Sequence, residues 1–293
     1  MIQTVGVVGA GQMGRGIAQV AAVAGHAVVL HDQEPGQWET GRAAIEQSLD
    51  KFVEKRKLTP EERDAALARI TFSTRLDALA PAELVIEAIV EDLGAKQALW
   101  RRLEAVTGKV CLFASNTSSL SIVDQSVGLA HPDRLMGLHF FNPVPLMALV
   151  EVVRSVRTSP AVLATGEAFV RGLGKVPVPA RDESGFVVNR LLVPYLLDAV
   201  RALEHGLGRV EDLDAAMHLG AGHPMGPFTL LDFVGLDTVV RIADIMFDQF
   251  REPRYAPPPL LRRMVAAGYH GRKNGRGFYD WSTEPPAPME LGL

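Results

Sequence analysis

The sequence predicts an α/β protein, in which a doubly wound, mostly parallel sheet is followed by an all-helical C-terminal domain. A glycine-rich turn, Gly9-Ala10-Gly11-Gln12-Met13-Gly14, joins a β-branched run to an Ala-rich segment. Short apolar runs then alternate with helical segments as far as Arg181, which is typical of βαβ units. From residue 182 on, the chain is rich in Ala, Leu and Arg with helical periodicity. This order predicts a Rossmann-type sheet and then helices.

The composition excludes several classes of protein. The chain has 293 residues, 47% of them hydrophobic and 22% charged, which fits a folded protein of two domains or one large one. A net charge of -4 argues against a dedicated nucleic-acid binder, and no apolar run approaches the roughly 20 residues that span a bilayer. The single cysteine, Cys111, excludes a fold built on disulfides, so we expect a cytoplasmic protein.

The first elements form one βαβ unit with a helical insertion behind it. Residues 2–8 are the first strand, residues 17–24 belong to a helix that Gly25 ends, and residues 27–30 are the second strand. Residues 38–69 are polar and Ala-rich, and Thr59-Pro60-Glu61-Glu62 is a helix start. We therefore expect a helical hairpin inserted between strands.

The remaining elements follow in the same way. Further buried strands are predicted at residues 84–89, 110–114, 134–140 and 149–153, and a last extended segment at residues 175–179. Helices are predicted at residues 186–204, 210–219 and 229–250, separated by segments rich in Gly or Pro. The domain boundary is placed near Arg181, which gives domains of residues 1–181 and 182–293.

The glycine-rich turn predicts a dinucleotide site. Gly9 allows the tight turn, Gly11 lets the backbone approach a pyrophosphate, and Gly14 lets the helix pack on the strand. Asp32 follows the second strand, where its carboxylate can accept hydrogen bonds from ribose hydroxyls. That carboxylate would repel a 2′-phosphate, which favours NAD over NADP. FAD folds share this start, and a purely structural glycine turn is the alternative.

His139 is the candidate general base among eight histidines. It lies at the end of an apolar strand and precedes Phe141-Asn142-Pro143-Val144-Pro145, where two prolines break regular structure. Ligands bind at the carboxyl ends of strands in open α/β sheets, and an imidazole is suited to take a hydroxyl proton near neutral pH. By itself, a histidine at a strand end is more often structural.

Several segments together resemble the 3-hydroxyacyl-CoA dehydrogenase family over nearly the whole chain. These are the glycine turn, Glu87-Ala88-Ile89-Val90-Glu91-Asp92, Ser115-Asn116-Thr117-Ser118-Ser119-Leu120, His139-Phe140-Phe141-Asn142-Pro143-Val144-Pro145 with Glu151, Ser184-Gly185-Phe186-Val187-Val188-Asn189-Arg190, and Gly271-Arg272-Lys273-Asn274-Gly275-Arg276-Gly277-Phe278-Tyr279. They occur in the order in which the family has them.

The resemblance implies a role for each matching residue. His139 would be the catalytic base, Glu151 its partner, and Ser118 and Asn189 would hydrogen-bond the oxygen at C3 of the substrate. Ser118 and Ser119 are hard to separate, and a capping run before a helix is an alternative for either. The implied cofactor contacts are Gly9, Ala10, Gly11, Gln12, Met13, Gly14, Asp32, Glu91, Lys96, Ser118, Asn142 and Lys273. Lys96 and Lys273 would act as point-charge donors, unless they are solvated surface lysines.

Ser48, Lys55 and Ser118 would contact coenzyme A. Ser48 and Lys55 lie seven residues apart, so both point the same way on a helix, and Lys51 adds charge nearby. The lysines there could also belong to a solvated helix face.

The implied function is NAD-dependent, reversible oxidation of (S)-3-hydroxyacyl-CoA, with 3-hydroxybutyryl-CoA as the expected substrate and no metal. The first domain would bind NAD, and the helical domain would bind substrate and form a homodimer. Two alternatives remain: a sugar-acid dehydrogenase resembling L-gulonate 3-dehydrogenases, which needs no CoA site, and a module that binds NAD without chemistry.

Overall fold

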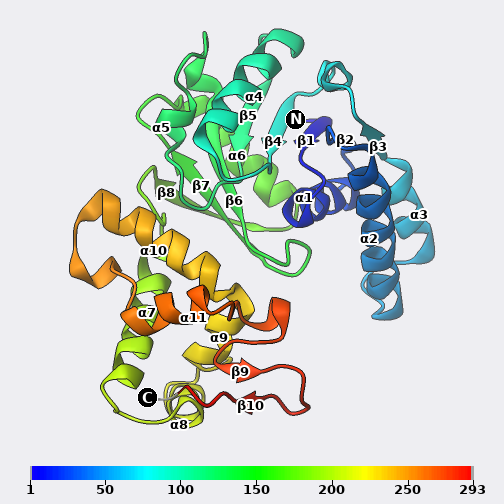
Figure 1. The fold of residues 1–293 in the computed structure, drawn as a ribbon. Coiled ribbons are helices and arrows are strands. Elements are labelled where there is room, and N and C mark those ends of the chain that lie inside the picture. The colour runs from blue at the N-terminus through cyan, green and yellow to red at the C-terminus, as the bar shows by residue number, and fades with distance from the viewer. Residues whose placement is uncertain (1, 292–293) are drawn as a thin grey trace. The chain divides into compact units, whose positions relative to one another are not determined.

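The computed structural model describes residues 2–291. These residues divide into two compact units, the first ending at Phe186 and the second beginning at Val187, and each unit has its own hydrophobic core. Figure 1 shows the sheet with its helices in the first unit and the helices of the second.

The first unit is built on an eight-stranded sheet with the order β3-β2-β1-β4-β5-β6-β7-β8. The strands are β1 (Thr4–Val8), β2 (Ala27–His31), β3 (Ile70–Ser73), β4 (Leu84–Glu87), β5 (Leu112–Ser115), β6 (Leu135–Phe140), β7 (Leu149–Arg154) and β8 (Val176–Arg181). Neighbouring strands pair in parallel, except that β6 and β7 are antiparallel. The predicted doubly wound sheet is confirmed.

Helices connect these strands. They are α1 (Gln12–Val23), α2 (Pro35–Glu54), α3 (Pro60–Ala68), α4 (Leu93–Val106), α5 (Ile122–Gln125) and α6 (Pro160–Gly172), with short 3₁₀ turns at Leu76–Leu79 and Pro132–Arg134. Helices α2 and α3 are the predicted hairpin between β2 and β3 (Figure 1). Thr59 and Glu62 form a reciprocal capping box at the start of α3, as the sequence around Pro60 indicates.

The sheet is apolar on both faces because each side is covered. In β4, Leu84 and Ile86 belong to one core with residues of α1 and α6, whereas Val85 belongs to another core with Trp100 of α4. Successive side chains of a strand point to opposite faces. A run of buried residues without alternation is therefore what a central parallel strand requires.

The second unit is helical with a small addition. Its helices are α7 (Val188–Glu204), α8 (Val210–Ala215), α9 (Pro227–Val234), α10 (Leu236–Phe250) and α11 (Pro259–Ala266). A π-helical turn follows α8 at Ala216–Gly220, and short 3₁₀ turns lie at Pro253–Tyr255 and Arg272–Asn274. An antiparallel pair, β9 (Tyr279–Asp280) and β10 (Ala287–Pro288), follows near the C-terminus. In the described part of the chain, the helices are too short or too polar to cross a membrane.

Three details differ from the sequence prediction. Residues 70–73 form β3, which was not predicted, and they lie at the edge of the sheet. The single helix predicted at residues 229–250 is two helices, because Gly235 has a φ of 96°, outside the helical region. The C-terminal unit is not entirely helical, since β9 and β10 pair there.

Candidate active site

The turn between β1 and α1 forms an open cradle. A Cβ on Gly14 would lie 1.7 Å from the carbonyl oxygen of Gly9, and a Cβ on Gly9 would lie 2.5 Å from that of Ala88. A Cβ on Gly11 would meet nothing within 4 Å. Gly9 and Gly14 are therefore required by the fold itself, whereas Gly11 leaves space beside the backbone. This arrangement fits the phosphates of a dinucleotide, which bind at such helix starts.

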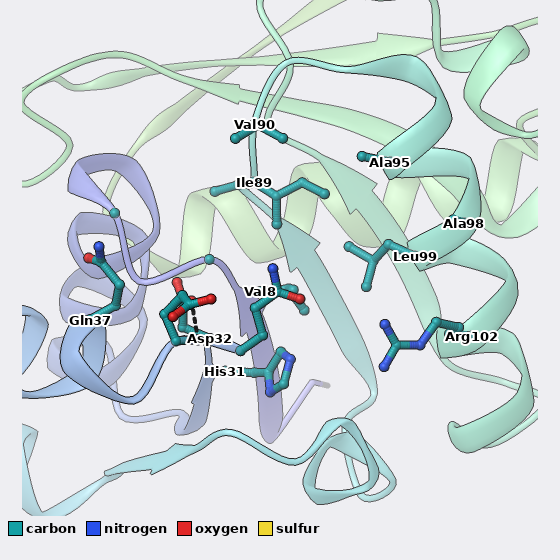
Figure 2. A pocket seen from close by; sticks show the side chains of 15 residues that line it. Val8, His31, Asp32, Gln37, Ile89, Val90, Ala95, Ala98, Leu99 and Arg102 are labelled. Carbon is teal, nitrogen blue, oxygen red and sulfur yellow. Dashed lines mark hydrogen bonds between the residues drawn. The ribbon is translucent and has the colours of Figure 1, made fainter.

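A cavity of about 460 Å³ begins at this cradle and extends between β2 and α4. Asp32 lies in its wall (Figure 2). Its Oδ2 accepts a hydrogen bond from the Ala10 amide at 2.7 Å, and its Oδ1 accepts one from the Glu34 amide at 3.1 Å. Asp32 thus ties the glycine turn to the end of β2. The neighbouring His31 has a lowered pKa because of its burial, so its imidazole is neutral near pH 7.

Sequence reasoning missed part of this wall. The missed lining residues come from the ends of β1, β2 and β4, from α2 and from α4: Val8, His31, Gln33, Glu34, Gln37, Ala88, Ile89, Val90, Ala95, Ala98, Leu99 and Arg102. Figure 2 shows the α4 side chains in a row along one side of the helix. The spacing of residues 95, 98, 99 and 102 is that of one helix face. This spacing is the sequence pattern from which the α4 side of the cavity could have been predicted.

His139 and Glu151 face each other across the antiparallel strands β6 and β7. The register pairs these two residues, and His139 Nδ1 lies 2.6 Å from Glu151 Oε2. Glu151 is fully buried and His139 is 6% exposed. Side chains directly opposite in an antiparallel pair are close neighbours. With the proton on Nδ1, the imidazole donates to the carboxylate and leaves Nε2 as a proton acceptor.

Aromatic rings fix the orientation of the imidazole further. The His139 ring centroid lies 4.4 Å from that of Phe141 and 5.6 Å from that of Phe186. The end of β6 and the loop that follows it are each held by a hydrogen bond to an asparagine side-chain oxygen. Asn116 Oδ1 accepts a hydrogen bond from the Phe140 amide at 2.9 Å, and Asn142 Oδ1 accepts one from Gln12 Nε2 at 3.0 Å. The end of β6 therefore contacts the serine segment, and the loop after it contacts the glycine turn.

In the loop after β5, the two candidate serines, Ser118 and Ser119, differ in their hydrogen bonds. The Ser119 hydroxyl is 3.1 Å from Glu91 Oε1, and this residue is 4% exposed. Ser118 donates only its backbone amide, at 3.3 Å, to the same oxygen, and its hydroxyl has no partner among the described residues. Ser118 is therefore the serine with a free hydroxyl, which a substrate or cofactor could engage.

Comparison with known proteins covers both units. Residues 4–183 match the NAD-binding domain of 3-hydroxyacyl-CoA dehydrogenase, and residues 185–281 match the C-terminal domain of the same family. The chain belongs to the 3-hydroxyacyl-CoA dehydrogenase family. This confirms the resemblance found in the sequence.

Individual family members match over nearly their full length. A 3-hydroxybutyryl-CoA dehydrogenase of Mycobacterium tuberculosis is 51% identical over 96% of this chain and 99% of its own. A mitochondrial hydroxyacyl-coenzyme A dehydrogenase of Sus scrofa is 46% identical over 96% of this chain and 92% of its own. The crystal structure of the (S)-3-hydroxybutyryl-CoA dehydrogenase PaaH1 from Ralstonia eutropha has a TM-score of 0.93 at 44% identity, covering 97% of this chain and all of that one.

In this member of the 3-hydroxyacyl-CoA dehydrogenase family, Lys96 is buried in an ion-pair network. Lys96 is 1% exposed, and its ammonium lies 2.5 Å from Glu87 Oε1 and 3.2 Å from Glu91 Oε2. Thr117 donates its hydroxyl to Glu91 as well. Burial opposes ionisation of Glu91, but Lys96 and the hydroxyl donors prevail and lower its pKa. The Lys96 ammonium thus lies against the carboxylates of Glu87 and Glu91.

The remaining predicted residues are placed as follows. Ser48 is half-buried in α2, Lys55 is exposed directly after its last residue, and Asn189 is half-buried in the first turn of α7. Lys273 Nζ lies 2.5 Å and 2.6 Å from the two carboxylate oxygens of Asp237. Asn189 and Lys273 both belong to the second unit. Among residues 2–291, no cluster of three or more His, Cys, Asp or Glu side chains is arranged to hold a metal ion.

Proposed function

We propose that this protein is an NAD-dependent (S)-3-hydroxyacyl-CoA dehydrogenase that acts on short acyl chains such as 3-hydroxybutyryl-CoA. The observation that carries the proposal is the buried contact of 2.6 Å between His139 and Glu151 at the carboxyl edge of the sheet. The names of the relatives from Mycobacterium tuberculosis and Ralstonia eutropha support the substrate class.

The side chains of this site carry out the proton half of the reaction. Nε2 of His139 accepts the proton of the substrate hydroxyl, and the Glu151 carboxylate stabilises the imidazolium that forms. Ser118 and Asn189 donate hydrogen bonds to the C3 oxygen as it changes from hydroxyl to carbonyl. When NAD⁺ is bound, it supplies the acceptor for the hydride that leaves C3. The reverse reaction uses the same groups with His139 protonated.

The residues that would hold the cofactor lie mainly in the first unit. The segment from Gly9 to Gly14 would receive the pyrophosphate and Asp32 the adenosine ribose, which favours NAD over NADP. Glu91, Lys96, Ser118, Asn142 and Lys273 would be further contacts to the cofactor. The Lys96 ammonium lies 3.2 Å from Glu91 Oε2. Ser48, Lys55 and Ser118 would contact coenzyme A.

We further propose that residues 1–181 form the NAD-binding domain and that residues 182–293 bind substrate and form a homodimer in the cytoplasm. Exposed apolar side chains in the second unit support the dimer: Leu219 is 79% exposed, Phe233 is 45% exposed and Val234 is 37% exposed. The lone thiol, Cys111, suits a reducing compartment, and bacterial relatives favour the cytoplasm.

The test is oxidation of NADH by the purified protein with acetoacetyl-CoA. The wild type should turn over, and His139→Gln or Glu151→Gln should lower kcat by about 10² to 10⁴ while leaving the KM for NADH within threefold. His131→Gln, at an exposed loop position, is the matched control and should retain full activity. A His139→Gln variant with wild-type turnover would contradict the assignment of the base. Activity on free hydroxy acids without activity on acyl-CoA would favour the sugar-acid alternative.

A further inference from the structure

The loop after β6, residues 141–148, carries two groups of the candidate site. Phe141 packs its ring against the imidazole of His139, with the two centroids 4.4 Å apart. Asn142 accepts a hydrogen bond from Gln12 of the glycine turn. The position of this loop therefore sets the surroundings of the candidate base.

The loop has few apolar contacts of its own. Among residues 141–148, all of which the structure describes, Val144 alone is buried, whereas Leu146 and Met147 are 59% and 40% exposed. The Leu146 and Met147 amides both donate to the carbonyl oxygen of Pro143. These two bonds close a turn, but they do not attach the turn to the rest of the unit.

Lys175 reaches this turn from the neighbouring strand. It directly precedes β8, where the Val176 amide donates to the carbonyl oxygen of Ala148 at 2.8 Å. The Lys175 ammonium donates to the carbonyl oxygen of Val144 at 2.7 Å and to that of Met147 at 2.6 Å. Such short distances are typical of hydrogen bonds from a charged donor. One side chain thus holds the turn at two points.

These two hydrogen bonds account for the burial of Lys175. The residue is 8% exposed, and among the described residues no carboxylate pairs with its ammonium. Burying an ammonium is costly unless it is hydrogen-bonded or paired, and burial lowers the pKa of Lys175. The carbonyl oxygens of the loop are therefore the groups that compensate the buried charge, so the lysine and the loop stabilise each other.

Helix α1 limits the other side of the turn. A Cβ on Gly16 would lie 2.9 Å from Cβ of Val144, so the helix and the loop approach more closely than a side chain at residue 16 allows. Val144 is two residues after Asn142 and three after Phe141, and consecutive Cα atoms are 3.8 Å apart. A displacement of the turn away from Lys175 therefore reaches both residues.

We propose that Lys175 is a positioning residue for the reaction, whose ammonium holds the loop after β6 so that Phe141 stays against the imidazole of His139. Small displacements of reacting groups lower turnover strongly, and such groups depend on the residues that support them. In this role Lys175 contacts neither substrate nor cofactor. The inference rests on the proposed function, because it takes His139 as the base.

The first experiment removes the ammonium with Lys175→Met. The kcat with acetoacetyl-CoA should fall about tenfold, because the loop is no longer held. The KM for NADH should stay within about threefold of the wild type, since the glycine turn and Asp32 are unchanged. Acetoacetyl-pantetheine, which lacks the nucleotide, should show the same fall in kcat. Lys109→Met, at an exposed position of the first unit, is the matched control and should keep the wild-type kcat.

A second experiment restores the ammonium from solution. In Lys175→Ala, n-propylammonium supplies the atoms that alanine lacks, and Lys175 lines a cavity of about 370 Å³ that can admit it. Propylammonium should raise the kcat of Lys175→Ala at least about threefold, because it donates hydrogen bonds as lysine does. Tetramethylammonium has the charge but no N–H donor, so it should have no effect.

A third measurement reports the contact between Phe141 and His139 without any substrate. The imidazole proton resonances of His139 are identified by their absence from the NMR spectrum of His139→Gln. An aromatic ring shifts the resonances of protons near its face, so these resonances should move in Lys175→Met. The resonances of His131, at an exposed position, should not move.

Three outcomes would overturn the inference: an unchanged kcat in Lys175→Met, a rise in the KM for acetoacetyl-CoA without a fall in kcat, or equal rescue by both cations. If Lys175→Met does not fold, Gly16→Ala displaces the same loop from the α1 side, and an unchanged kcat in that variant would overturn the inference as well. If neither thioester is a substrate of the wild type, the proposed function fails. The His139 resonances in Lys175→Ala with and without propylammonium then still decide whether Lys175 positions Phe141.

Discussion

Lys96 and Glu87 form an ion pair whose two side chains are out of contact with solvent. Glu87 is fully buried, and besides Lys96 its carboxylate accepts hydrogen bonds from the Ile89 amide and the Ser115 hydroxyl, each at 2.7 Å. One carboxylate thus joins the ends of β4 and β5 to α4. Desolvating both charges is costly, so such a pair contributes little net stability, yet removing one partner leaves the other uncompensated.

We therefore expect Glu87→Gln to lower the free energy of unfolding by about 3 kcal/mol, measured by urea denaturation. The double variant Glu87→Gln/Lys96→Met should recover part of this loss, since it removes a buried cation that would keep only Glu91 as a carboxylate partner. The control is Glu46→Gln, which breaks the exposed pair between Arg42 and Glu46 and should change the free energy by less than about 0.5 kcal/mol. Equal stability of Glu87→Gln and Glu46→Gln would contradict this view of the network.

At the residue scale, the sequence predicted which residues are candidates for the site, but not which hydrogen bonds their side chains form. Ser118 and Ser119 have the same chemistry and adjacent positions, so only the three-dimensional course of the loop shows that Glu91 engages the Ser119 hydroxyl. Lys96 illustrates the same limit. Lysine is rarely buried unless it is paired. The sequence does not show that Lys96 pairs with Glu87, so it does not predict that Lys96 is buried.

At the scale of elements, the turn between β1 and α1 combines two different requirements for glycine. The hydrogen of Gly14 is needed for packing against the Gly9 carbonyl, whereas Gly11 borders open space. Gly11 has a φ of -65°, which any residue can adopt. Within this one motif, Gly14 is therefore required for folding, whereas Gly11 is required for ligand binding.

Gly11→Ala should keep the free energy of unfolding within about 1 kcal/mol of the wild type and raise the KM for NADH at least about tenfold, because the added methyl group lies where a pyrophosphate would approach. Gly14→Ala should lower the stability by several kcal/mol or prevent folding, since its methyl group overlaps a backbone oxygen. Urea denaturation and steady-state kinetics measure the two effects. A Gly11→Ala variant with a wild-type KM for NADH would contradict the proposal that the cradle binds the phosphates.

The elements that the sequence predicted are those with strong apolar patterns. The central strands were found because their residues are buried on both faces. Strand β3 was missed because it is a short edge strand of four partly exposed residues, which leaves little apolar signal. Helices α9 and α10 were merged because their apolar pattern continues across Gly235, and one positive φ decides the break.

At the scale of the whole molecule, the sequence pattern changes near Arg181 from alternating strands and helices to continuous helical periodicity. This change predicted an α/β part and a helical part, because the two patterns require different packing. The structure has one unit of each kind. Subunit association depends on exposed surface rather than on periodicity, so composition alone gave no information about it.

The proposed dimer leads to an expected mass in solution. Light scattering should give twice the chain mass of 31.7 kDa. Leu219→Lys, in the second unit, should weaken association because it places a charge on an exposed apolar position. Val156→Lys, at a position that is 93% exposed in the first unit, should leave it unchanged. A wild-type mass of one chain over the whole concentration range would refute the dimer.

The burial of Cys111 has a practical consequence for labelling. This thiol is 1% exposed, and burial raises its pKa to about 11, whereas alkylating reagents and maleimides react with accessible thiolates. The native protein therefore needs no cysteine removed before conjugation. A single cysteine introduced at a surface position would supply the accessible thiol that reacts. A fluorophore or spin label can therefore be attached to either unit in the otherwise unaltered protein.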